Sequence, residues 1–434
     1  MKLSMFQLIV LISFVGFLLA GIAAFSLFGG NRGSSIGQVT IWGTLDQQTM
    51  QSLLVTLRSQ NKEFQNVTYV QKDPSTYYTD LINAMASGTG PDLFFITQDT
   101  VTNFSNKITV IPYSAESQAT YLSSFLNEGQ LFLTPQGALA LPFSIDPLVM
   151  YWNKDLFASA GIAQPPVYWS DFLSLAPQIT SIDTSSNIAR SAVALGSWKN
   201  ITHAKMILSA LFMEAGDPIM LRTGSGSLES VFGTTPAAAA ENPASSALLF
   251  YTEFANPSKT TYSWNDALPQ SRDAFAAGNV AVYFGTASDN QLLLQTNPNL
   301  NFGVALLPQI KGNATHLTFG ELTGLAISRS ASNPQGALAV AQALTSLSIQ
   351  ESLLQQGTVI PARSDISINT SANAAEAIFE QSAIMSQGWL DPDPSATDPL
   401  FENMIESVVT GQQDPAQAVA QASQAMIQLS TTAQ

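Results

Sequence analysis

Acidic side chains are the residues of this chain best suited to chemistry. Asp99, Asp146, Asp289 and Glu321 fall in predicted loops after strands, or at a break between two strands. Two carboxyl groups held about 5 to 9.5 Å apart can hydrolyse a glycosidic bond. The same side chains can instead bind the hydroxyls of a polar ligand, or remain solvated loop acids. Which of these roles applies depends on the helices and strands that position the four side chains.

Other catalytic patterns in the chain are incomplete. Gly33–Gly37 matches the G-x-S-x-G of serine hydrolases, but it lies in a predicted tether and not between a strand and a helix. His203 can act as a general base, although a helix-start or surface histidine is the favoured interpretation. His203 and His316 lack the H-E-x-x-H spacing, and no glycine motif for phosphates or dinucleotides is present. We therefore expect no metal and no cofactor.

Composition excludes several further classes of protein. The 434 residues contain no cysteine, which excludes disulfides, thiolate zinc sites and cysteine catalysis. The net charge of −15 leaves no basic face for a phosphate backbone, so we expect no nucleic-acid partner. The length is sufficient for two domains, each with its own core.

The N-terminus predicts a membrane signal. Residues 5–28 are 24 positions without a charge, and as a helix they would extend about 36 Å, enough to cross the hydrocarbon layer. We expect residues 1–30 to be an uncleaved anchor with a cytoplasmic N-terminus. A cleaved secretory signal is the main alternative, and a buried core helix is less favoured. Residues 31–38 then form a tether, and the anchor and the signal both export the chain from residue 39 onward.

The exported part begins with strands and helices in alternation. Strands are predicted at Val39–Trp42, Val67–Val70 and Leu93–Ile96, with helices at about 46–64 and 77–85 between them. This order indicates a parallel sheet, and such sheets bind ligands beyond the carboxyl ends of their strands. The loops that begin at Gly43–Thr44 and Thr97–Asp99 are therefore candidate sites.

The middle of the chain predicts a passage between two halves. Pro142 and Pro147 interrupt the strand signals on either side of them, as expected where a chain crosses from one half to the other. Further strands are predicted at Val280–Phe284, Phe302–Leu307 and Gly324–Ile327, followed by a helix at about 333–354 and a mainly helical C-terminal part. The fold class expected is α/β.

The residues around this passage resemble a known family. Ala140–Phe157, Ala160–Ile162 and Pro165–Phe172 are similar to the "LPF…YNKDLF…AGI…PP.TW.DF" pattern of the family 1 extracellular solute-binding proteins of ABC importers, which includes maltose and other sugar receptors. Shorter similarities occur in the same order along the chain at Thr40–Gly43, Gly88–Phe94, Phe275–Val282, Gly303–Pro308 and 411–426.

The resemblance implies a two-lobed periplasmic-binding-protein fold of type II-like topology. Lobe 1 would be residues 39–145 plus 310–357, and lobe 2 residues 147–307 plus 361–434. Hinge crossings are expected near Ile145–Pro147, Leu307–Ile310 and Gly357–Pro361. The ligand would lie between the lobes, and closure around it would be read by the membrane permease.

The resemblance also implies the pocket. Alignment with the maltose-type pattern assigns pocket positions to Trp42, Thr44, Gln98, Asp99, Asp146, Trp198 and the Gly285–Asp289 loop, with Glu321, Trp389 and Phe401 as further candidates. Aromatic rings suit the apolar face of a sugar, while Asp and Gln suit its hydroxyls. A tryptophan of the maltose-type pattern is replaced by Thr286–Ser288, which favours a smaller or more polar solute than a maltose-like oligosaccharide.

Three functions follow, in order of preference. The first is a membrane-tethered, monomeric receptor outside the cytoplasm, not an enzyme, which delivers a small solute, preferably a sugar, to ABC permease subunits. The second is a cell-surface glycosidase that uses two of the four acids Asp99, Asp146, Asp289 and Glu321. The third is a sensing or adhesion module on the same fold.

Overall fold

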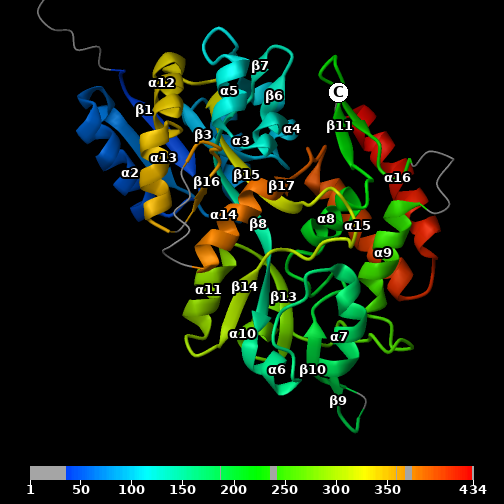
Figure 1. Ribbon diagram of the computed structural model, residues 1–434. Coiled ribbons are helices and arrows are strands. Elements are labelled where there is room, and N and C mark those ends of the chain that lie inside the picture. The colour runs from blue at the N-terminus through cyan, green and yellow to red at the C-terminus, as the bar shows by residue number, and fades with distance from the viewer. Residues whose placement is uncertain (1–35, 186, 235–241, 358, 367–373, 433–434) are drawn as a thin grey trace, which may run out of the picture.

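The computed structural model describes residues 36–185, 187–234, 242–357, 359–366 and 374–432 (Figure 1). It begins with the predicted alternation of strands and helices: β1 (Val39–Gly43), α2 (Gln47–Gln60), β2 (Val67–Gln71), α3 (Tyr77–Ala86) and β3 (Leu93–Thr97). Strand β1 pairs in parallel with both β2 and β3, so the predicted parallel sheet is confirmed. Asp46 begins α2 because its carboxylate accepts hydrogen bonds from the backbone N–H groups of Gln48 and Thr49.

Two long antiparallel strands run through the middle of the molecule. They are β8 (Leu141–Asn153) and β15 (Thr318–Ser328), and β15 also pairs with β3. The predicted break at Pro142 and Pro147 is wrong, because both prolines lie inside β8. A register shift between Thr323 and Gly324 leaves Phe143 as an extra residue of β8, and this bulge accommodates the neighbouring Pro142, which has no N–H to donate.

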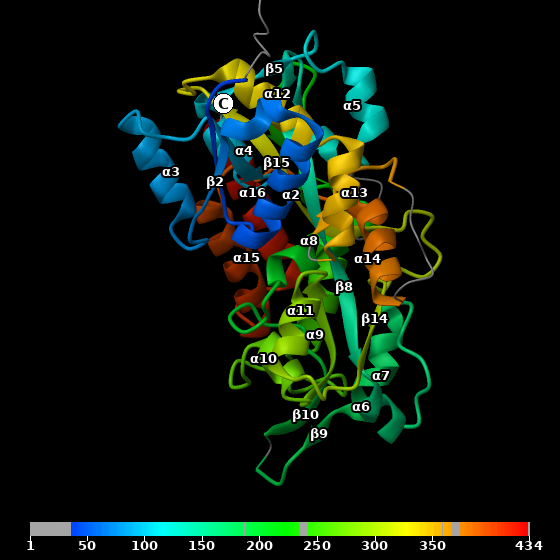
Figure 2. The same ribbon diagram turned by 90° about the vertical axis from the view of Figure 1, so that its left-hand side faces the viewer.

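The sheet continues from β8 into the second half of the molecule. Its main path is β2-β1-β3-β15-β8-β13-β10-β9, with β13 at Val280–Thr286, β10 at Ile188–Val193 and β9 at Ser181–Ile182. Strand β14 (Phe302–Ala305) pairs with β8, and β16 (Ile360–Pro361) pairs with β8 beside the bulge. The elongated shape in Figure 2 follows from this arrangement, with β8 extending from the upper part of the molecule to the lower.

Helices cover both halves. The predicted helix over 333–354 is two helices, α12 (Pro334–Leu344) and α13 (Leu347–Gln355), which meet at Thr345 and Ser346. The C-terminal part is mainly helical, as predicted, with α14 (Ala374–Met385), α15 (Pro394–Val409) and α16 (Pro415–Thr432). In the second half, α8 (Ala204–Glu214) and α11 (Asp289–Thr296) begin near the centre of the molecule.

The remaining elements are short or peripheral. The helices are α4 (Val101–Phe104), α5 (Gln118–Ser124), α6 (Lys154–Ser159), α7 (Phe172–Ile179), α9 (Pro243–Glu253) and α10 (Ser271–Ala276), with 3₁₀ turns η1 (Lys62–Asn66), η2 (Ser105–Lys107), η3 (Asn127–Phe132) and η4 (Trp169–Asp171). The strands are β4 (Ile108–Thr109), β5 (Ile111–Pro112), β6 (Leu133–Thr134), β7 (Gly137–Ala138), β11 (Met220–Arg222), β12 (Leu228–Ser230) and β17 (Ser386–Gln387).

Two large hydrophobic clusters support the two halves. The first joins β1, α2, α12 and α13 and includes Ile41, Leu54 and Leu344. The second is larger, fills the other half around β8, β10 and β13, and extends to one face of β3. A separate core on each side of the crossing strands is what a two-lobed α/β architecture requires.

The predicted membrane segment lies outside the described residues, since the description begins at residue 36. Within the described ranges, no helix combines the length and the apolar composition needed to cross a bilayer.

Candidate functional site

Two adjoining cavities form a cleft between the halves. They have volumes of about 880 and 470 Å³, and Glu321 lines both. These volumes lie in or near the range of about 300 to 1,000 Å³ that is typical of small-molecule sites. The larger cavity is bordered by the ends of β1 and α13, the start of α11, and α14; the smaller one by the end of β3, the start of α8 and the loop before α15.

Strands β8 and β15 form the floor of the cleft. Ser144 and Asp146 on β8, and Glu321 and Thr323 on β15, face the larger cavity. These residues alternate with buried apolar side chains, because successive side chains of a strand point to opposite faces. Asp146 and Glu321 are register partners across the two strands, so the ladder brings two predicted site residues together.

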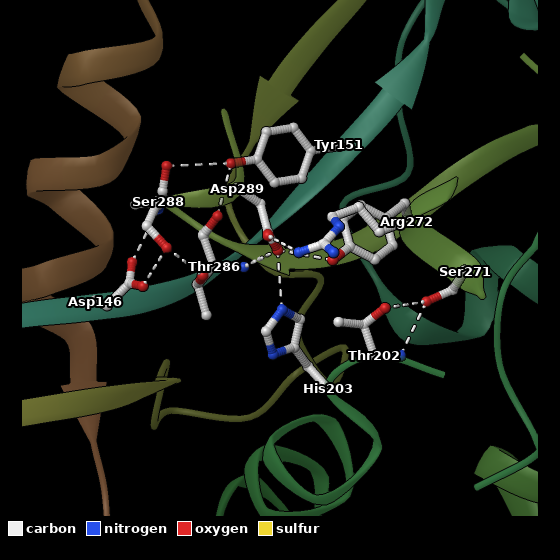
Figure 3. A network of polar contacts seen from close by, with 11 residues as sticks. Asp146, Tyr151, Thr202, His203, Ser271, Arg272, Thr286, Ser288 and Asp289 are labelled. Atoms are coloured by element: carbon white, nitrogen blue, oxygen red, sulfur yellow. Dashed lines mark hydrogen bonds and ion pairs between the residues drawn. The ribbon is translucent and has the colours of Figure 1, made fainter. Parts of the chain in front are cut away.

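Asp146 connects the crossing strand to a helix of the second half. Its carboxylate accepts hydrogen bonds from the backbone N–H of Ser288 at 3.0 Å and from the Ser288 hydroxyl at 2.6 Å (Figure 3). Ser288 immediately precedes α11. Burial raises the pKa of Asp146, while the hydrogen bonds from Ser288 oppose the increase.

Asp289 is the centre of a buried polar network. Its carboxylate accepts hydrogen bonds from the Tyr283 hydroxyl at 2.7 Å and the Thr286 backbone N–H at 3.2 Å, and it contacts His203 Nε2 at 2.8 Å and Arg272 at 3.4 Å (Figure 3). Burial opposes ionisation, but these partners outweigh it and hold the pKa of Asp289 below its usual value. Asp289 lines neither cavity, whereas His203 lines the smaller one. Asp289 therefore positions His203.

The end of β3 contributes two predicted residues to the smaller cavity. The Gln98 side chain joins β3 to β15, because its Nε2 donates to the Gly320 carbonyl at 3.0 Å and its Oε1 accepts from the Leu322 N–H at 2.6 Å. Asp99 accepts a short hydrogen bond from the Thr97 hydroxyl. Burial raises the pKa of Asp99.

Glu321 differs from the other acids of the cleft. Among the described residues, no hydrogen bond or ion pair involves its carboxylate. The side chain is accessible from the cleft, yet the two halves of the protein enclose it. This enclosure raises the pKa of Glu321 to about 8, with further contributions from the negative charges of Asp99 and Asp146.

The predicted aromatic residues occupy different positions. Trp198 and Trp389 line the smaller cavity. Phe401 is buried behind Trp389, and their rings stack at 6.1 Å with an angle of 10°. Trp42 lines neither cavity and has the Lys72 ammonium 3.6 Å from its ring centroid. Thr44, also predicted, is exposed in the wall of the larger cavity.

Several cleft residues were missed by sequence reasoning. Lys205 at the start of α8 donates hydrogen bonds to Asp391 at 2.7 Å and Thr397 at 2.8 Å, and it forms an ion pair with Asp398. In the sequence, the local signal near this contact is the Asp-Pro-Asp-Pro run at 391–394, which is typical of a helix start. It includes the partner Asp391 but gives no indication of Lys205. His203 was interpreted as a helix-start residue and does immediately precede α8. Within the described ranges, no group of three or more His, Asp or Glu side chains could hold a metal ion.

The family model of bacterial extracellular solute-binding proteins matches residues 44–351, which is most of the chain. The chain therefore belongs to this family of binding proteins, and the resemblance seen in the sequence is confirmed. Membership implies a location outside the cytoplasm. No curated protein sequence matches the chain closely enough to count as a relative.

Solved structures of the same architecture support the two-lobed fold. A solute-binding protein of an ABC transporter from Thermotoga lettingae, bound to α-D-tagatose, aligns with a TM-score of 0.68 at 21% identity over 91% of this chain and 99% of its own. A cyclic α-maltosyl-1,6-maltose binding protein from Arthrobacter globiformis gives 0.73 at 15% identity, covering 91% and 99%. The maltose/maltodextrin-binding domain from Bdellovibrio bacteriovorus, bound to maltotriose, gives 0.65 at 14%, covering 90% and 99%.

Proposed function

We propose that the protein is the solute receptor of an ABC-type importer and that it captures a carbohydrate or a similar small polar solute in the cleft. The observation that carries this proposal is the placement of Glu321, on a strand that joins the two halves and in the wall of both cavities. The family membership and the sugars named for the similar structures support it.

Closure of the two halves on the ligand would provide the signal for transport. We assign lobe 1 to residues 39–145 plus 310–357 and lobe 2 to residues 147–307 plus 361–434, with the connections near Ile145–Pro147 on β8, Leu307–Ile310 and Gly357–Pro361. A ligand that touches both lobes only when they are closed has a higher affinity for the closed form. It would shift the population toward that form, which the permease subunits would recognise.

The ligand contacts would come from both sides of the cleft. Thr44, Gln98 and Asp99 would act from lobe 1, and Trp198 from lobe 2. Asp146 and Glu321 on the crossing strands would bind polar groups, and Trp389, supported by Phe401, would present an apolar face. Trp42 and Asp289 would support this wall from behind.

We further propose that residues 1–30 keep the receptor at the membrane, or direct its export when removed, and that it acts as a monomer. The apolar run at residues 5–28 supports the membrane role.

A hydrolase is the less favoured function. Of the four acids predicted for it, Asp289 is fully engaged by its partners and lines neither cavity. Asp146 and Glu321 line the larger cavity, and Asp99 and Glu321 line the smaller one. A sensing or adhesion module would keep the cleft but would not stimulate a permease.

Thermal denaturation of the full-length chain with sugars, polyols, peptides and phosphates tests the proposal. A ligand at 100 times its Kd stabilises the folded protein by about 2.7 kcal/mol. We expect one sugar class to stabilise the protein in this way, without turnover of that sugar. We expect Trp198→Ala to reduce the stabilisation. Glu229→Gln, an exposed acid on β12, serves as the control and should change nothing. Stabilisation by peptides alone, or turnover of the sugar, would contradict the proposal.

A further inference from the structure

Acidic side chains are the charged groups in the described lining of the larger cavity. Its described lining contains six carboxylates and no Lys, Arg or His: Asp46, Asp146, Glu321, Glu351, Glu376 and Glu380. Such a wall attracts positive charge and repels negative charge, and the effect is stronger in an enclosed cleft than in open water. The net charge of the whole chain, −15, has the same sign.

The floor of the cavity places two of these carboxylates opposite each other. Asp146 and Glu321 are register partners on neighbouring antiparallel strands, an arrangement that is destabilising for like charges. Asp146 is compensated by its two hydrogen bonds from Ser288. Glu321 has no such compensation among the described residues, so ionising its carboxyl costs free energy, and a cationic group of a ligand can offset that cost.

The bases near Glu321 already have acidic partners. The smaller cavity, which shares Glu321, includes Lys199, His203 and Lys205. Lys205 pairs with Asp391 and Asp398, His203 contacts Asp289 at 2.8 Å, and Lys199 pairs with Asp266 at 3.5 Å. Each of these basic side chains thus contacts at least one carboxylate, and none of these contacts involves Glu321.

We propose that the ligand is an amine-substituted sugar whose protonated amine pairs with Glu321 and Asp146 on the cleft floor. This proposal rests on the proposed receptor function and adds the charge of the ligand to it. A protonated amine donates charge-assisted hydrogen bonds to both side chains and favours the ionised form of Glu321 beside Asp146. A sugar that carries a carboxylate or phosphate meets six acids and is rejected, which gives selectivity through repulsion as well as attraction.

Binding of a cation should also release a proton. Enclosure raises the pKa of Glu321 to about 8, so this carboxyl is mostly protonated at pH 7 before the ligand arrives. A neighbouring ammonium favours the ionised form and lowers the pKa. The proton then leaves to the buffer, whereas a neutral sugar leaves it in place.

Isothermal titration calorimetry on the full-length chain tests the proposal with four matched oligosaccharide series. These are glucosamine oligomers, their N-acetylated counterparts, neutral glucose oligomers and uronic acid oligomers of equal length. We expect the glucosamine oligomers to bind about tenfold or more tighter than the N-acetylated and neutral series, because a hydrogen bond between charged groups is stronger than one between neutral groups. The uronic acid series should not bind, and added salt should weaken the amine complex.

Two variants locate the effect. Glu321→Gln should reduce the affinity for glucosamine oligomers about tenfold more than the affinity for neutral oligomers, and it should abolish the proton release measured in buffers of different ionisation enthalpy. Glu229→Gln on β12 is the same substitution outside both cavities and should leave both affinities unaltered.

Equal affinity for the amine and neutral series, or binding of the uronic acid series, would overturn this inference while the sugar receptor itself stands. Failure of all four series, with a simple polyamine binding instead, would overturn both the inference and the proposed sugar receptor. The two failures are therefore distinguishable in one set of titrations.

Discussion

Asp289 contributes to the cleft through its neighbours and not through direct contact. It is 3% exposed, and it orients His203, which does line the smaller cavity. A buried carboxylate of this kind is stable only because hydrogen bonds and positive charge compensate it. Replacing the carboxylate by an amide removes its charge and one of the two oxygens that accept these hydrogen bonds.

We predict that Asp289→Asn destabilises the protein by about 3 kcal/mol at pH 7, the lower end of the cost of breaking a buried ion pair. Because the pKa of Asp289 is lowered in the folded state, its contribution is present above its unfolded value of about 3.9 and is lost as the pH falls through the folded value. Urea unfolding measures the free energy of unfolding of the wild-type protein and the variant at pH 7 and pH 3. The difference between the two proteins should be smaller at pH 3.

A surface pair provides the matched control. Asp365 accepts two hydrogen bonds from Arg363 at 2.7 and 2.6 Å, but it is exposed. Asp365→Asn should cost at most about 1 kcal/mol, since exposed ion pairs contribute little. If Asp289→Asn and Asp365→Asn lowered the free energy of unfolding equally, burial would not determine the strength of the Asp289 network.

At the scale of elements, the close approach of β15, β17 and η3 depends on glycine. A Cβ on Gly320 would lie 2.6 Å from Oε2 of Glu128 and 2.7 Å from the Ser386 side chain, while a Cβ on Gly388 would lie 2.3 Å from Glu128 Oε1. Glu128 is 4% exposed, and neither of its carboxyl oxygens has a hydrogen-bond partner among the described residues. Burial, followed by the charge of Glu321, raises the pKa of Glu128 well above its usual value. This acid is packed tightly beside the crossing strand.

We predict that Gly320→Ala destabilises the protein by about 1–3 kcal/mol, because overpacking at this junction must displace Glu128 or Ser386. Chemical denaturation measures the change. Gly224→Ala is the control, since a Cβ at Gly224 meets no atom within 4 Å, and it should be close to neutral. An unchanged midpoint for Gly320→Ala would mean that the three elements move apart at little cost.

The whole molecule carries many carboxyl groups whose ionisation is opposed by burial. Besides Glu128 and Glu321, these include Asp99, Asp146 and Glu214, whose pKa values are raised mainly by burial. Glu321 faces Asp99 after β3, Asp146 on β8 and Glu128 in η3. It shares the smaller cavity with the bases Lys199, His203 and Lys205 and with the acids Asp391 and Asp398. The acids outnumber the bases around it.

We predict that the thermal midpoint of the ligand-free protein decreases as the pH rises from about 5 to 8. A carboxyl whose pKa is raised on folding holds its proton in the folded state while the unfolded chain has lost it. The unfolded state then binds fewer protons, and the free energy of unfolding decreases with pH. For Glu321 this window extends from about 4.3 in the unfolded chain to about 8.

Scanning calorimetry at several pH values, with Glu321→Gln as the comparison, measures the dependence. The variant cannot ionise at this position, so its midpoint should decrease less steeply between pH 5 and 8. A midpoint that rises with pH in the wild-type protein would show that the repulsion among the acids of the cleft is compensated in the folded state.

The sequence by itself determined the elements and the family. Short apolar or alternating segments predicted β1, β2, β3 and β13, because such patterns are local properties of the chain. The motif around Ala140–Phe157 identified the family, since it is a contiguous segment. Local signals also misled: Pro142 and Pro147 indicated a break, and only pairing with β15, with its bulge, shows how one strand contains both.

The tertiary structure alone decided which predicted side chains meet in the cleft. Asp146 and Glu321 are 175 positions apart in sequence, and the register of β8 and β15 places them opposite each other. In the same packing, Asp289 and Phe401 lie outside the cavity walls, whereas His203 and Lys205 line the smaller cavity. Exposure and charge pairing depend on neighbours from distant parts of the chain, so no local pattern could report them.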